Sequence, residues 1–547
     1  MKIGTRGSDL AMWQARLVRA LLHEKAGVEA EIVVIKTTGD ADQTTSFDKM
    51  EGKGFWTKEI EAALLDGTVD LAVHSLKDLQ TTMPDGLTLG AVLNRADRRD
   101  MVLMRPESRD DSQFLYLKKG AKVGTTSARR VAQLQYLRPD LDVQPLRGNV
   151  PTRVRKAREG NYDAIMIAAA GVERLELPLD GLVVSRLPET VFVPAPGQGA
   201  LAVQIRDNDA AVEDAVRLID EEATRQTVWL EREILRQLEG GCQLPLGSAA
   251  EATDDGYTLR LFLGRINGQP ARRIVLSGQD SGAMADAAVR YLRGQGTPQR
   301  PSDRRAHVWL TREPDRAADF ANAVNPEAAE VSAIPVFVAV ESGDEHKQQD
   351  ALANLDRYNW IMFTSQVTVS RFKELLVANK QSIPEATKLG AIGRKTAAAM
   401  KKEGWRTDFV STVADAVSLG NEFVSKVTRD HVTILFPCSA KASDDFETTV
   451  GGSTMKFERL VCYDTVAHPN LKDTVSALPS PDVVVFTSPS ASRFLLDTGA
   501  IPDDIVPISI GPSTTRALRE RGFSLVWEAV DRSLEGLAEV TNGLLAH

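Results

Sequence analysis

Short apolar runs alternate with amphipathic stretches along nearly the whole chain. Clear examples are Glu31–Ile35 (EIVVI), Leu71–Val73 and Ile361–Phe363, and each is followed by a segment in which the apolar residues have helical spacing. Buried strands followed by amphipathic helices are typical of α/β folds with mostly parallel sheets. The pattern therefore predicts an α/β protein throughout.

The segment Arg293–Arg305 (RGQGTPQRPSDRR) interrupts this alternation. It is polar, it contains Gly and Pro, and it shows no apolar periodicity. It divides the chain into parts of roughly 300 and 240 residues, and each part is larger than a typical single domain. We therefore expect two multi-domain modules joined by a short linker.

The second module repeats two short blocks. Phe363–Phe372 reads FTSQVTVSRF and Phe486–Phe494 reads FTSPSASRF; farther along, Gly393 and Gly511 are each followed by Thr after 3 residues and by Gly after 11. This pattern indicates two similar α/β domains, in which an apolar strand ends and a Thr-Ser pair caps the next helix. The alternative is that each block is an ordinary capping sequence of an α/β fold.

Composition favours a soluble protein of a reducing compartment. Of the 547 residues, 43% are hydrophobic, and the formal net charge of −9 argues against a general nucleic-acid binder without excluding a local basic pocket. Three cysteines, an odd number, do not make a disulfide framework. No stretch approaches the ~20 apolar residues that span a bilayer, and the N-terminus lacks a signal-type apolar run. We expect a cytoplasmic protein without a membrane segment.

A cluster of functional side chains follows one predicted strand. The strand Val69–Val73 leads into HSLKD, which places Lys77 and Asp78 at the carboxyl end of the strand, where α/β folds carry their sites. Asp78 is a candidate acid or charge stabiliser, and Lys77 is a candidate anion contact. The alternative is a solvated turn with a helix cap.

Arginines gather beside small residues in several loops of the first module. A guanidinium binds a carboxylate through two parallel hydrogen bonds, so converging arginines suit a polyacidic ligand. Any one of them alone is compatible with a plain surface residue, but several together in an acidic protein favour an internal anion-binding cleft. The arginines of this group are Arg6, Arg129, Arg130, Arg147, Arg153 and Arg174.

Two loops add further candidates. Glu51–Glu59 (EGKGFWTKE) carries Lys53 and Lys58, and it is either a flexible cover that brings positive charge over a site or a plain loop before a helix. Cys242 lies in GGCQLPLG, whose glycines and proline indicate an exposed loop with a thiol accessible as a nucleophile or attachment point. No spacing of Cys and His indicates a metal site.

Together these pieces resemble one family. The motifs RGSDLAMWQ, KGFWTKE, HSLKD, GTTSARR, LRGNVPTR, AAAGVERL, PAPGQGAL and GGCQLPLG occur in the order seen in porphobilinogen deaminase (hydroxymethylbilane synthase). The second module, residues 306–547, is similar to uroporphyrinogen-III synthase in VWLTREP, in the paired FTS and Gly-x-x-Thr blocks and in VCYDT. The two activities are consecutive in tetrapyrrole (porphyrin and heme) biosynthesis, so their fusion makes chemical sense.

The first resemblance implies a transferase that joins four porphobilinogen units into hydroxymethylbilane and releases ammonia at each step. In the family the chain grows on a dipyrromethane cofactor attached through a thioether, and the matching residue here is Cys242. Asp78 matches the catalytic aspartate, which stabilises the azafulvenium cation left when ammonia departs, and Lys77 beside it is a second candidate catalytic residue. The sequence departs from the family after Asp78, because the usual proline is delayed to Pro84, and this puts the local loop shape in question.

The same resemblance assigns the carboxylate contacts. Each pyrrole unit carries an acetate and a propionate, so every added unit brings two carboxylates. The implied cofactor contacts are Lys77, Asp78, Thr125, Ser127, Arg129 and Arg130; the implied substrate contacts are Arg6, Ser8, Arg147, Arg153 and Arg174, with Lys53 and Lys58 on a mobile lid.

The second resemblance implies a lyase that cyclises hydroxymethylbilane to uroporphyrinogen III with inversion of the last ring. The family works largely by holding its substrate folded between two domains, with helix N-termini and hydroxyls on the carboxylates. Tyr463 is the candidate proton donor. The matching substrate contacts are Arg312, Thr364, Ser365, Thr487, Ser488, Ser490 and Thr514.

The resemblances also imply a domain plan. The N-terminal module is expected to have three α/β domains, two of them like periplasmic binding proteins, and the C-terminal module two similar α/β domains joined by crossing strands. The expected boundaries are 1–98 plus 198–217, 99–197, 218–295 with the cofactor cysteine, a linker at 296–305, 306–337 plus 467–547, and 338–466.

Three functions remain open at this point. The first is a bifunctional, monomeric, cytoplasmic enzyme that binds porphobilinogen and hydroxymethylbilane but no metal, nucleic acid or membrane. The second is an active deaminase with a catalytically silent synthase-like module, which would release only the linear product and its spontaneous cyclisation product, isomer I. The third is a non-enzymatic anion-binding protein, which explains the arginines but neither the loop of Cys242 nor the carboxylate of Asp78.

Overall fold

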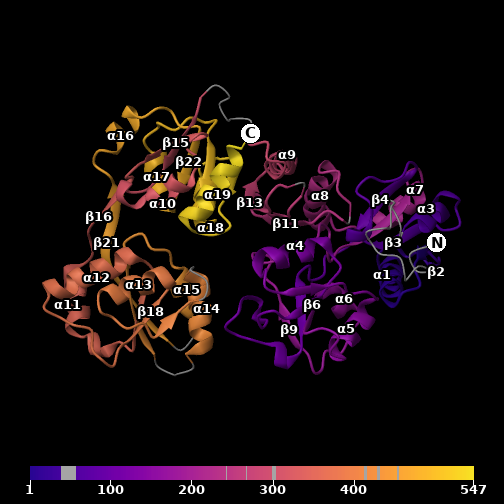
Figure 1. The fold of residues 1–547 in the computed structure, drawn as a ribbon, viewed down its shortest axis with the longest axis horizontal. Coiled ribbons are helices and arrows are strands. Elements are labelled where there is room, and N and C mark those ends of the chain that lie inside the picture. Colours follow the sequence, from indigo (N-terminus) through magenta and orange to yellow (C-terminus); the bar gives the residue numbers. More distant parts are fainter. Residues whose placement is uncertain are drawn as a thin grey trace.

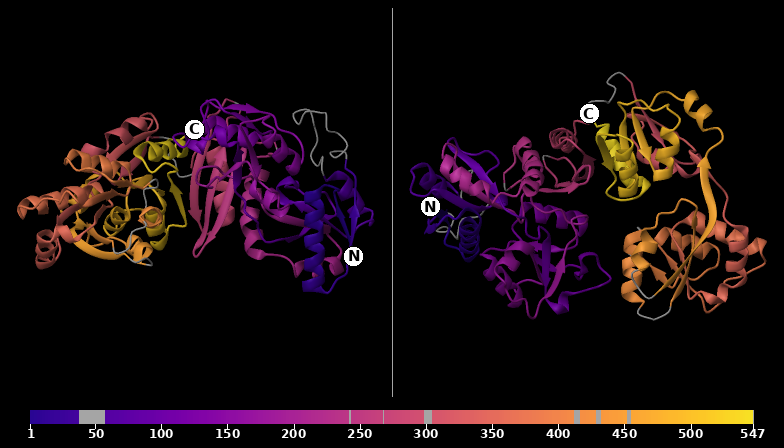
Figure 2. Two further views of the ribbon diagram at one scale, coloured as in Figure 1. Left: turned by 90° about the horizontal axis from the view of Figure 1, so that it is seen from below. Right: turned by 180° about the vertical axis from the view of Figure 1, so that it is seen from behind.

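The structure, a computed structural model, describes residues 1–37, 57–241, 243–266, 268–297, 304–411, 416–427, 432–451 and 455–546. Helices and strands alternate along the chain in several α/β layers (Figure 1), which confirms the predicted α/β class. Figure 2 shows the N-terminal module, residues 1–297, beside the C-terminal module, residues 304–546. They meet where α9 (Ser281–Leu292) approaches α19 (Leu534–Leu544).

The first sheet orders its strands β2-β1-β3-β10-β4. The chain leaves this sheet after β4 and returns through β10, which runs antiparallel to both of its neighbours. Apolar side chains of α1, including Val18 and Leu22, pack into the core on one face. The bounds are β1 (Lys2–Thr5), β2 (Glu31–Val34), β3 (Leu71–Ser75), β4 (Leu87–Val92), β10 (Leu201–Arg206), α1 (Asp9–Ala26), α3 (Lys58–Leu65) and α7 (Ala210–Arg217).

The second sheet, ordered β7-β6-β8-β5-β9, is built from the segment between β4 and β10. Its strand β8 is buried at every position because apolar clusters cover both faces, one with Leu134 of α4 and the other with Val154 of α5. The bounds are β5 (Asp100–Met104), β6 (Lys122–Gly124), β7 (Asp142–Gln144), β8 (Ala164–Ala168), β9 (Val183–Arg186), α4 (Ala128–Leu137), α5 (Val150–Arg158), α6 (Ala169–Arg174), η3 (Pro106–Ser108) and η4 (Phe114–Tyr116).

The third sheet contains strands from both modules, and we call it the shared sheet. In the described part of the chain it has eight strands, ordered β11-β12-β13-β24-β23-β22-β14-β15. No feature of the sequence pattern predicts this continuity. The bounds are β11 (Leu246–Thr253), β12 (Gly256–Leu263), β13 (Arg272–Gly278), β14 (Ala306–Leu310), β15 (Ala329–Ala333), β22 (Val483–Phe486), β23 (Val506–Ser509), β24 (Leu525–Glu528), α8 (Glu222–Gln237), α10 (Ala318–Ala323), α16 (Leu471–Ala477), α17 (Pro489–Leu496), α18 (Pro512–Glu520) and η5 (Pro314–Arg316).

The fourth sheet, ordered β16-β21-β20-β17-β18-β19, forms the rest of the C-terminal module. Strands β16 and β21 pair antiparallel, and they lead between this sheet and the shared sheet (Figure 1). The bounds are β16 (Phe337–Glu341), β17 (Trp360–Phe363), β18 (Lys388–Ala391), β19 (Phe409–Val410), β20 (Thr433–Ser439), β21 (Lys456–Ala467), α11 (Glu345–Ala353), α12 (Gln366–Ala378), α13 (Arg394–Lys402), α14 (Ala416–Lys426), α15 (Asp445–Gly451) and η6 (Leu355–Arg357).

The internal repeat of the C-terminal module is a repeated strand–cap–helix unit, as the sequence predicts. Ser365 follows β17 and Ser488 follows β22, and each side chain accepts a hydrogen bond from the backbone N–H three residues on, at 3.0 and 3.1 Å. Gly393 and Gly511 likewise precede α13 and α18. The two copies therefore present equivalent helix N-termini at the carboxyl ends of their strands.

Candidate active site

A pocket lies between the first and second sheets. Its walls come from the end of β3 with the short helix η2 (Leu76–Asp78), from α5 and α6 beside the second sheet, and from the returning segment 198–200. This is the carboxyl edge at which α/β folds carry their ligands. The lining residues are Leu10, Ser75, Lys77, Arg130, Val150, Arg153, Ile167, Ala168, Ala170, Gly171, Arg174, Gln198, Gly199 and Ala200.

Four cationic side chains reach this pocket, and three of them bond only to neutral groups among the described residues. Lys77 Nζ donates to Gln198 Oε1 at 3.4 Å, and Arg153 Nε donates to the Gly148 carbonyl at 2.7 Å. Arg174 Nη2 donates to the Gly199 carbonyl at 2.6 Å, and its guanidinium lies 5.6 Å from the ring centre of Trp13. The fourth cation is Arg130. The pocket therefore has positive charge available for an anionic ligand.

Burial already disfavours the charged forms of Lys77, Arg153 and Arg174. It lowers the pKa of Lys77 to about 8, an effect that the nearby carboxylate of Asp78 opposes. It lowers the pKa of Arg153 and the pKa of Arg174 to about 10 each. Because a bound carboxylate would favour the charged forms again, anion binding and the charge of this pocket are coupled.

Asp78 is exposed beside this lining and acts electrostatically on two of its cations. Its negative charge raises the pKa of Lys77 and the pKa of Arg153 against the effect of burial. The loop after Asp78, where the proline is delayed, is held by Arg232 of α8, which donates to the carbonyls of Leu76 (3.1 Å), Leu79 (3.0 Å) and Gln80 (2.6 Å). The loop shape that the sequence left in question is thus set by a guanidinium.

Arg129 and Arg130 both contact one buried carboxylate. Arg129 Nη1 donates to Asp100 Oδ2 at 2.6 Å and to the Val193 carbonyl at 2.8 Å, and Arg130 Nη2 donates to Asp100 Oδ1 at 2.7 Å. Burial would raise the pKa of Asp100, but the two guanidiniums outweigh burial and hold that pKa well below its usual range. Arg130 also lines the pocket, whereas the lining does not include Arg129.

Two other predicted substrate contacts, Arg6 and Ser8, lie just before the N-terminus of α1. Ser8 caps α1, and its hydroxyl accepts a hydrogen bond from the Ala11 N–H at 3.4 Å. Arg6 is partly buried near His74, whose pKa falls to about 4 chiefly because of burial, with a smaller contribution from the charge of Arg6.

Further predicted contacts lie outside the lining. Thr125 is buried, and its hydroxyl accepts a hydrogen bond from the N–H of Ser127, which precedes α4, at 3.3 Å. Arg147 is partly buried and Lys58 is the exposed first residue of α3. The predictions for Lys53 and Cys242 fall outside the described residues.

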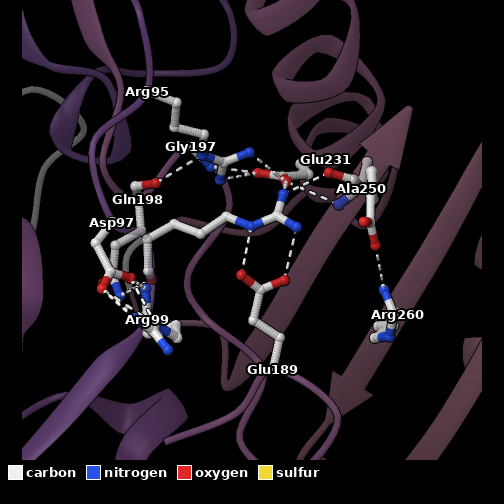
Figure 3. Close-up of polar contacts among 11 residues, drawn as sticks. Arg95, Asp97, Arg99, Glu189, Gly197, Gln198, Glu231, Ala250 and Arg260 are labelled. Atoms are coloured by element: carbon white, nitrogen blue, oxygen red, sulfur yellow. Dashed lines mark hydrogen bonds and ion pairs between the residues drawn. The ribbon is translucent and has the colours of Figure 1, made fainter. Parts of the chain in front are cut away.

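Sequence reasoning missed a buried ion pair that joins the connections between the two sheets to α8 (Figure 3). Glu231 is fully buried and accepts from Arg95 Nη1 and Nη2 at 2.8 Å each, from the Gly197 N–H at 2.7 Å and from the Ala250 N–H at 2.8 Å. Arg98 in the same connection pairs with Glu189 at 2.6 Å. The feature of the sequence that could have revealed this ion pair is Glu231 itself, a glutamate on the apolar face of α8.

A second candidate site lies at the repeated helix N-termini of the C-terminal module. The Tyr463 hydroxyl is 3.5 Å from both Ser365 Oγ and Thr368 Oγ1, so the predicted proton donor and one predicted contact lie together. Thr487 Oγ1 donates to the Thr311 carbonyl at 2.5 Å. Thr514 is buried, and its hydroxyl has no hydrogen-bond partner among the described residues.

The other predicted residues of this half are partly buried. Thr364 lies between β17 and the cap of α12, and Ser490 lies in the first turn of α17. Arg312 Nε donates to the Arg316 carbonyl at 3.1 Å, and burial lowers the pKa of Arg312. Within the described ranges, no group of three or more His, Cys, Asp or Glu could hold a metal ion, and no helix is long and apolar enough to cross a membrane.

Comparison with known proteins assigns the two modules. A porphobilinogen deaminase from Sulfurimonas denitrificans is 47% identical over 270 residues, which are 49% of this chain and 84% of that protein. The chain belongs to the porphobilinogen deaminase family. The family models for the dipyrromethane cofactor-binding domain and for the C-terminal domain of the deaminase match residues 1–214 and 225–288. A deaminase from Moorella thermoacetica is 42% identical over 54% of this chain and 94% of its own.

The C-terminal module carries a uroporphyrinogen-III synthase domain. The family model of uroporphyrinogen-III synthase HemD matches residues 318–539. Among solved structures, a mutant uroporphyrinogen III synthase from Thermus thermophilus covers 44% of this chain and 98% of its own, with 17% identity and a TM-score of 0.33. The family-model matches place deaminase and synthase domains in one chain, which is a bifunctional tetrapyrrole-biosynthesis enzyme.

Proposed function

We propose that the deaminase module polymerises porphobilinogen to hydroxymethylbilane in the pocket between its first two sheets, and that the synthase module cyclises this product to uroporphyrinogen III. The observation that carries the first half is the pocket itself. Lys77, Arg130, Arg153 and Arg174 line it, and Asp78 lies beside it. Such a set binds a polycarboxylate and still offers one negative charge to a cation that forms during reaction.

The donor set fits the dipyrromethane cofactor that the family carries. Two pyrrole units bring four carboxylates, and the pocket offers cations whose described partners are mostly neutral carbonyl oxygens. When bound, the cofactor would supply the free pyrrole carbon to which the first substrate unit is joined. Cys242 is the proposed attachment point, and the proposed further contacts are Thr125, Ser127, Arg129, Arg6, Ser8, Arg147, Lys53 and Lys58.

Asp78 is the proposed catalytic carboxylate. When the C–N bond of porphobilinogen breaks and ammonia leaves, positive charge develops on the pyrrole that remains. A carboxylate on a loop held by Arg232 faces this charge without having to move, which lowers the barrier. Lys77 and Arg153 meanwhile hold acetate and propionate groups, so binding and charge stabilisation fall to different side chains.

In the synthase module we assign catalysis mainly to substrate positioning. The equivalent N-termini of α12 and α17 offer backbone N–H groups and the hydroxyls of Ser365 and Ser488 to carboxylates. The Thr514 hydroxyl near the start of α18, which has no partner in the described part of the chain, adds a donor. Tyr463 is the proposed proton donor, and the proposed remaining contacts are Arg312, Thr364, Thr487 and Ser490.

The domain plan expected from the sequence, with boundaries at 98, 197, 217, 295, 305, 337 and 466, is retained as a proposal. Separate sheets support the domains 1–98 plus 198–217, 99–197 and 338–466, whereas strands of 218–295 and of 306–337 plus 467–547 lie in one sheet. The proposed setting is a monomer in the cytoplasm that acts on small molecules alone.

Intact-mass spectrometry of the full chain tests the deaminase assignment. The purified protein should weigh two pyrrole units more than its sequence, and a substoichiometric amount of porphobilinogen should add further units one at a time. Cys242→Ala should abolish both increments, whereas Cys438→Ala, at a buried thiol, should keep them. An unmodified wild-type mass, or a Cys242→Ala protein that still gains the two units, would refute the attachment.

A further inference from the structure

The deaminase and synthase modules are joined by strand pairing in addition to the linker. β13 and β24 pair antiparallel, and because β12 and β23 flank them, neither is left as an open sheet edge. The paired residues are Val275 with Glu528, Leu276 with Trp527, Ser277 with Val526, and Gly278 with Leu525.

One apolar core continues across this junction. Leu276 and Trp527 belong to the same buried cluster, and the ring of Trp527 packs against that of Tyr291 of α9 at a tilt of 37°, with the ring centres 5.3 Å apart. Tyr291 lies so close to α19 that a Cβ added at Gly543 would come within 2.3 Å of its ring. A shared buried cluster and such close contact between α9 and α19 are typical of the interior of one domain rather than of a surface between two domains.

Polar contacts close the two ends of the junction. The N–H of Thr297 donates to the carbonyl of Leu544 at 2.8 Å, at the end of the synthase chain. Arg519 of α18 is buried; its Nη2 donates to the Asp255 carbonyl at 3.0 Å, and its Nε lies 3.3 Å from the carboxylate of the same residue. These bonds would be broken together if the modules separated.

We propose that the β11–β13 region of the deaminase and the β22–β24 region of the synthase form one permanent rigid body. The edge of the deaminase sheet is then a docking surface whose partner is the synthase domain of the same chain. The strand pairing at the junction is independent of the proposed function, whereas its consequence for the cofactor and the synthase rests on that function. Since Cys242 precedes β11 by four residues, the domain proposed to carry the cofactor keeps a constant orientation to the synthase.

An engineered disulfide across the junction tests this permanence. Directly opposed residues of an antiparallel pair have Cα atoms about 4.5–5.5 Å apart, which suits a disulfide. We expect Ser277→Cys/Val526→Cys to oxidise in the full chain, and we expect its deaminase and synthase rates to agree within twofold with and without dithiothreitol.

The matched control is Thr258→Cys/Val526→Cys. Thr258 of β12 lies opposite Ser277 of β13, and Ser277 lies opposite Val526 of β24. About two strand spacings, roughly 10 Å, therefore separate Thr258 from Val526. This pair should not cross-link. The proposal is overturned if the Ser277/Val526 pair does not oxidise, if the control pair oxidises equally well, or if oxidation stops turnover and reduction restores it.

Hydrogen exchange in the unaltered protein gives a second test that needs no substitution and no activity. The amides of β13 that face β24 should exchange as slowly as those of the interior strand β12. Exchange at the rate of an exposed sheet edge would show that the modules come apart in solution.

Discussion

The pocket cations differ in how far the protein already neutralises their charge. Arg130 shares the carboxylate of Asp100 with Arg129, whereas Lys77, Arg153 and Arg174 bond to neutral oxygens. Sequence analysis treats all of these arginines as one group, because a sequence does not show which guanidinium already binds a carboxylate of the protein. Only the fold shows which of them already have a carboxylate partner. Asp100 is the first residue of β5, and nothing in the sequence pattern connects it with Arg129 and Arg130.

Removal of the Asp78 charge should slow turnover far more than it weakens binding. Asp78→Asn keeps the size of the side chain but removes the charge that faces the developing cation, so kcat should fall roughly 100-fold or more. KM for porphobilinogen should change little because the carboxylate contacts remain. Steady-state kinetics of ammonia release provide the measurement, and a kcat near that of the wild type would remove Asp78 from the mechanism.

The deaminase should lose efficiency above about pH 8. Burial lowers the pKa of Lys77 to about 8, so its ammonium is present below that pH and is lost above it, together with its attraction for substrate carboxylates. We expect kcat/KM, which reports the free enzyme, to fall above this pH. In Lys77→Arg the guanidinium stays charged, so the fall should disappear; a fall of equal size in the variant would contradict the assignment.

Two consecutive residues of α8 organise the elements around the deaminase pocket. Glu231 holds the connections between the first two sheets through Arg95 and the Gly197 N–H, and Arg232 holds the loop that follows Asp78. The motif HSLKD predicts where Asp78 lies. The contacts of Glu231 with Arg95 and of Arg232 with the Leu76 carbonyl were not predictable, because they join residues more than 130 positions apart.

Glu231→Ala should destabilise the deaminase module strongly. The substitution leaves the largely buried Arg95 guanidinium and two backbone N–H groups without their partner, at a cost of about 3–5 kcal/mol. Glu233→Ala, two positions along, removes a pair with the half-exposed Arg236 and a hydrogen bond from Gln237, and it should cost no more than about 1 kcal/mol. Urea unfolding measures both. Equal losses in the two variants would show that the Glu231 pair has no special role.

At the scale of the whole molecule, the deaminase and synthase modules are covalently and structurally continuous. The sequence predicts two modules, the repeat within the second and the α/β class, because those follow from local pattern and ordered motifs. It does not predict the shared sheet, because β13 reads as an ordinary strand and its partner β24 lies some 250 residues away. Under the proposed function, holding both sites in one chain would raise the effective concentration of the second site for the product of the first.

The central claim is that both modules work in one chain, and product analysis tests it directly. The purified protein is supplied with porphobilinogen alone, the products are oxidised, and the uroporphyrin isomers are separated. Hydroxymethylbilane that leaves the deaminase uncyclised closes spontaneously to isomer I, whereas the synthase inverts the last ring. We predict mainly isomer III. Mainly isomer I would contradict the account and show that only the deaminase is active.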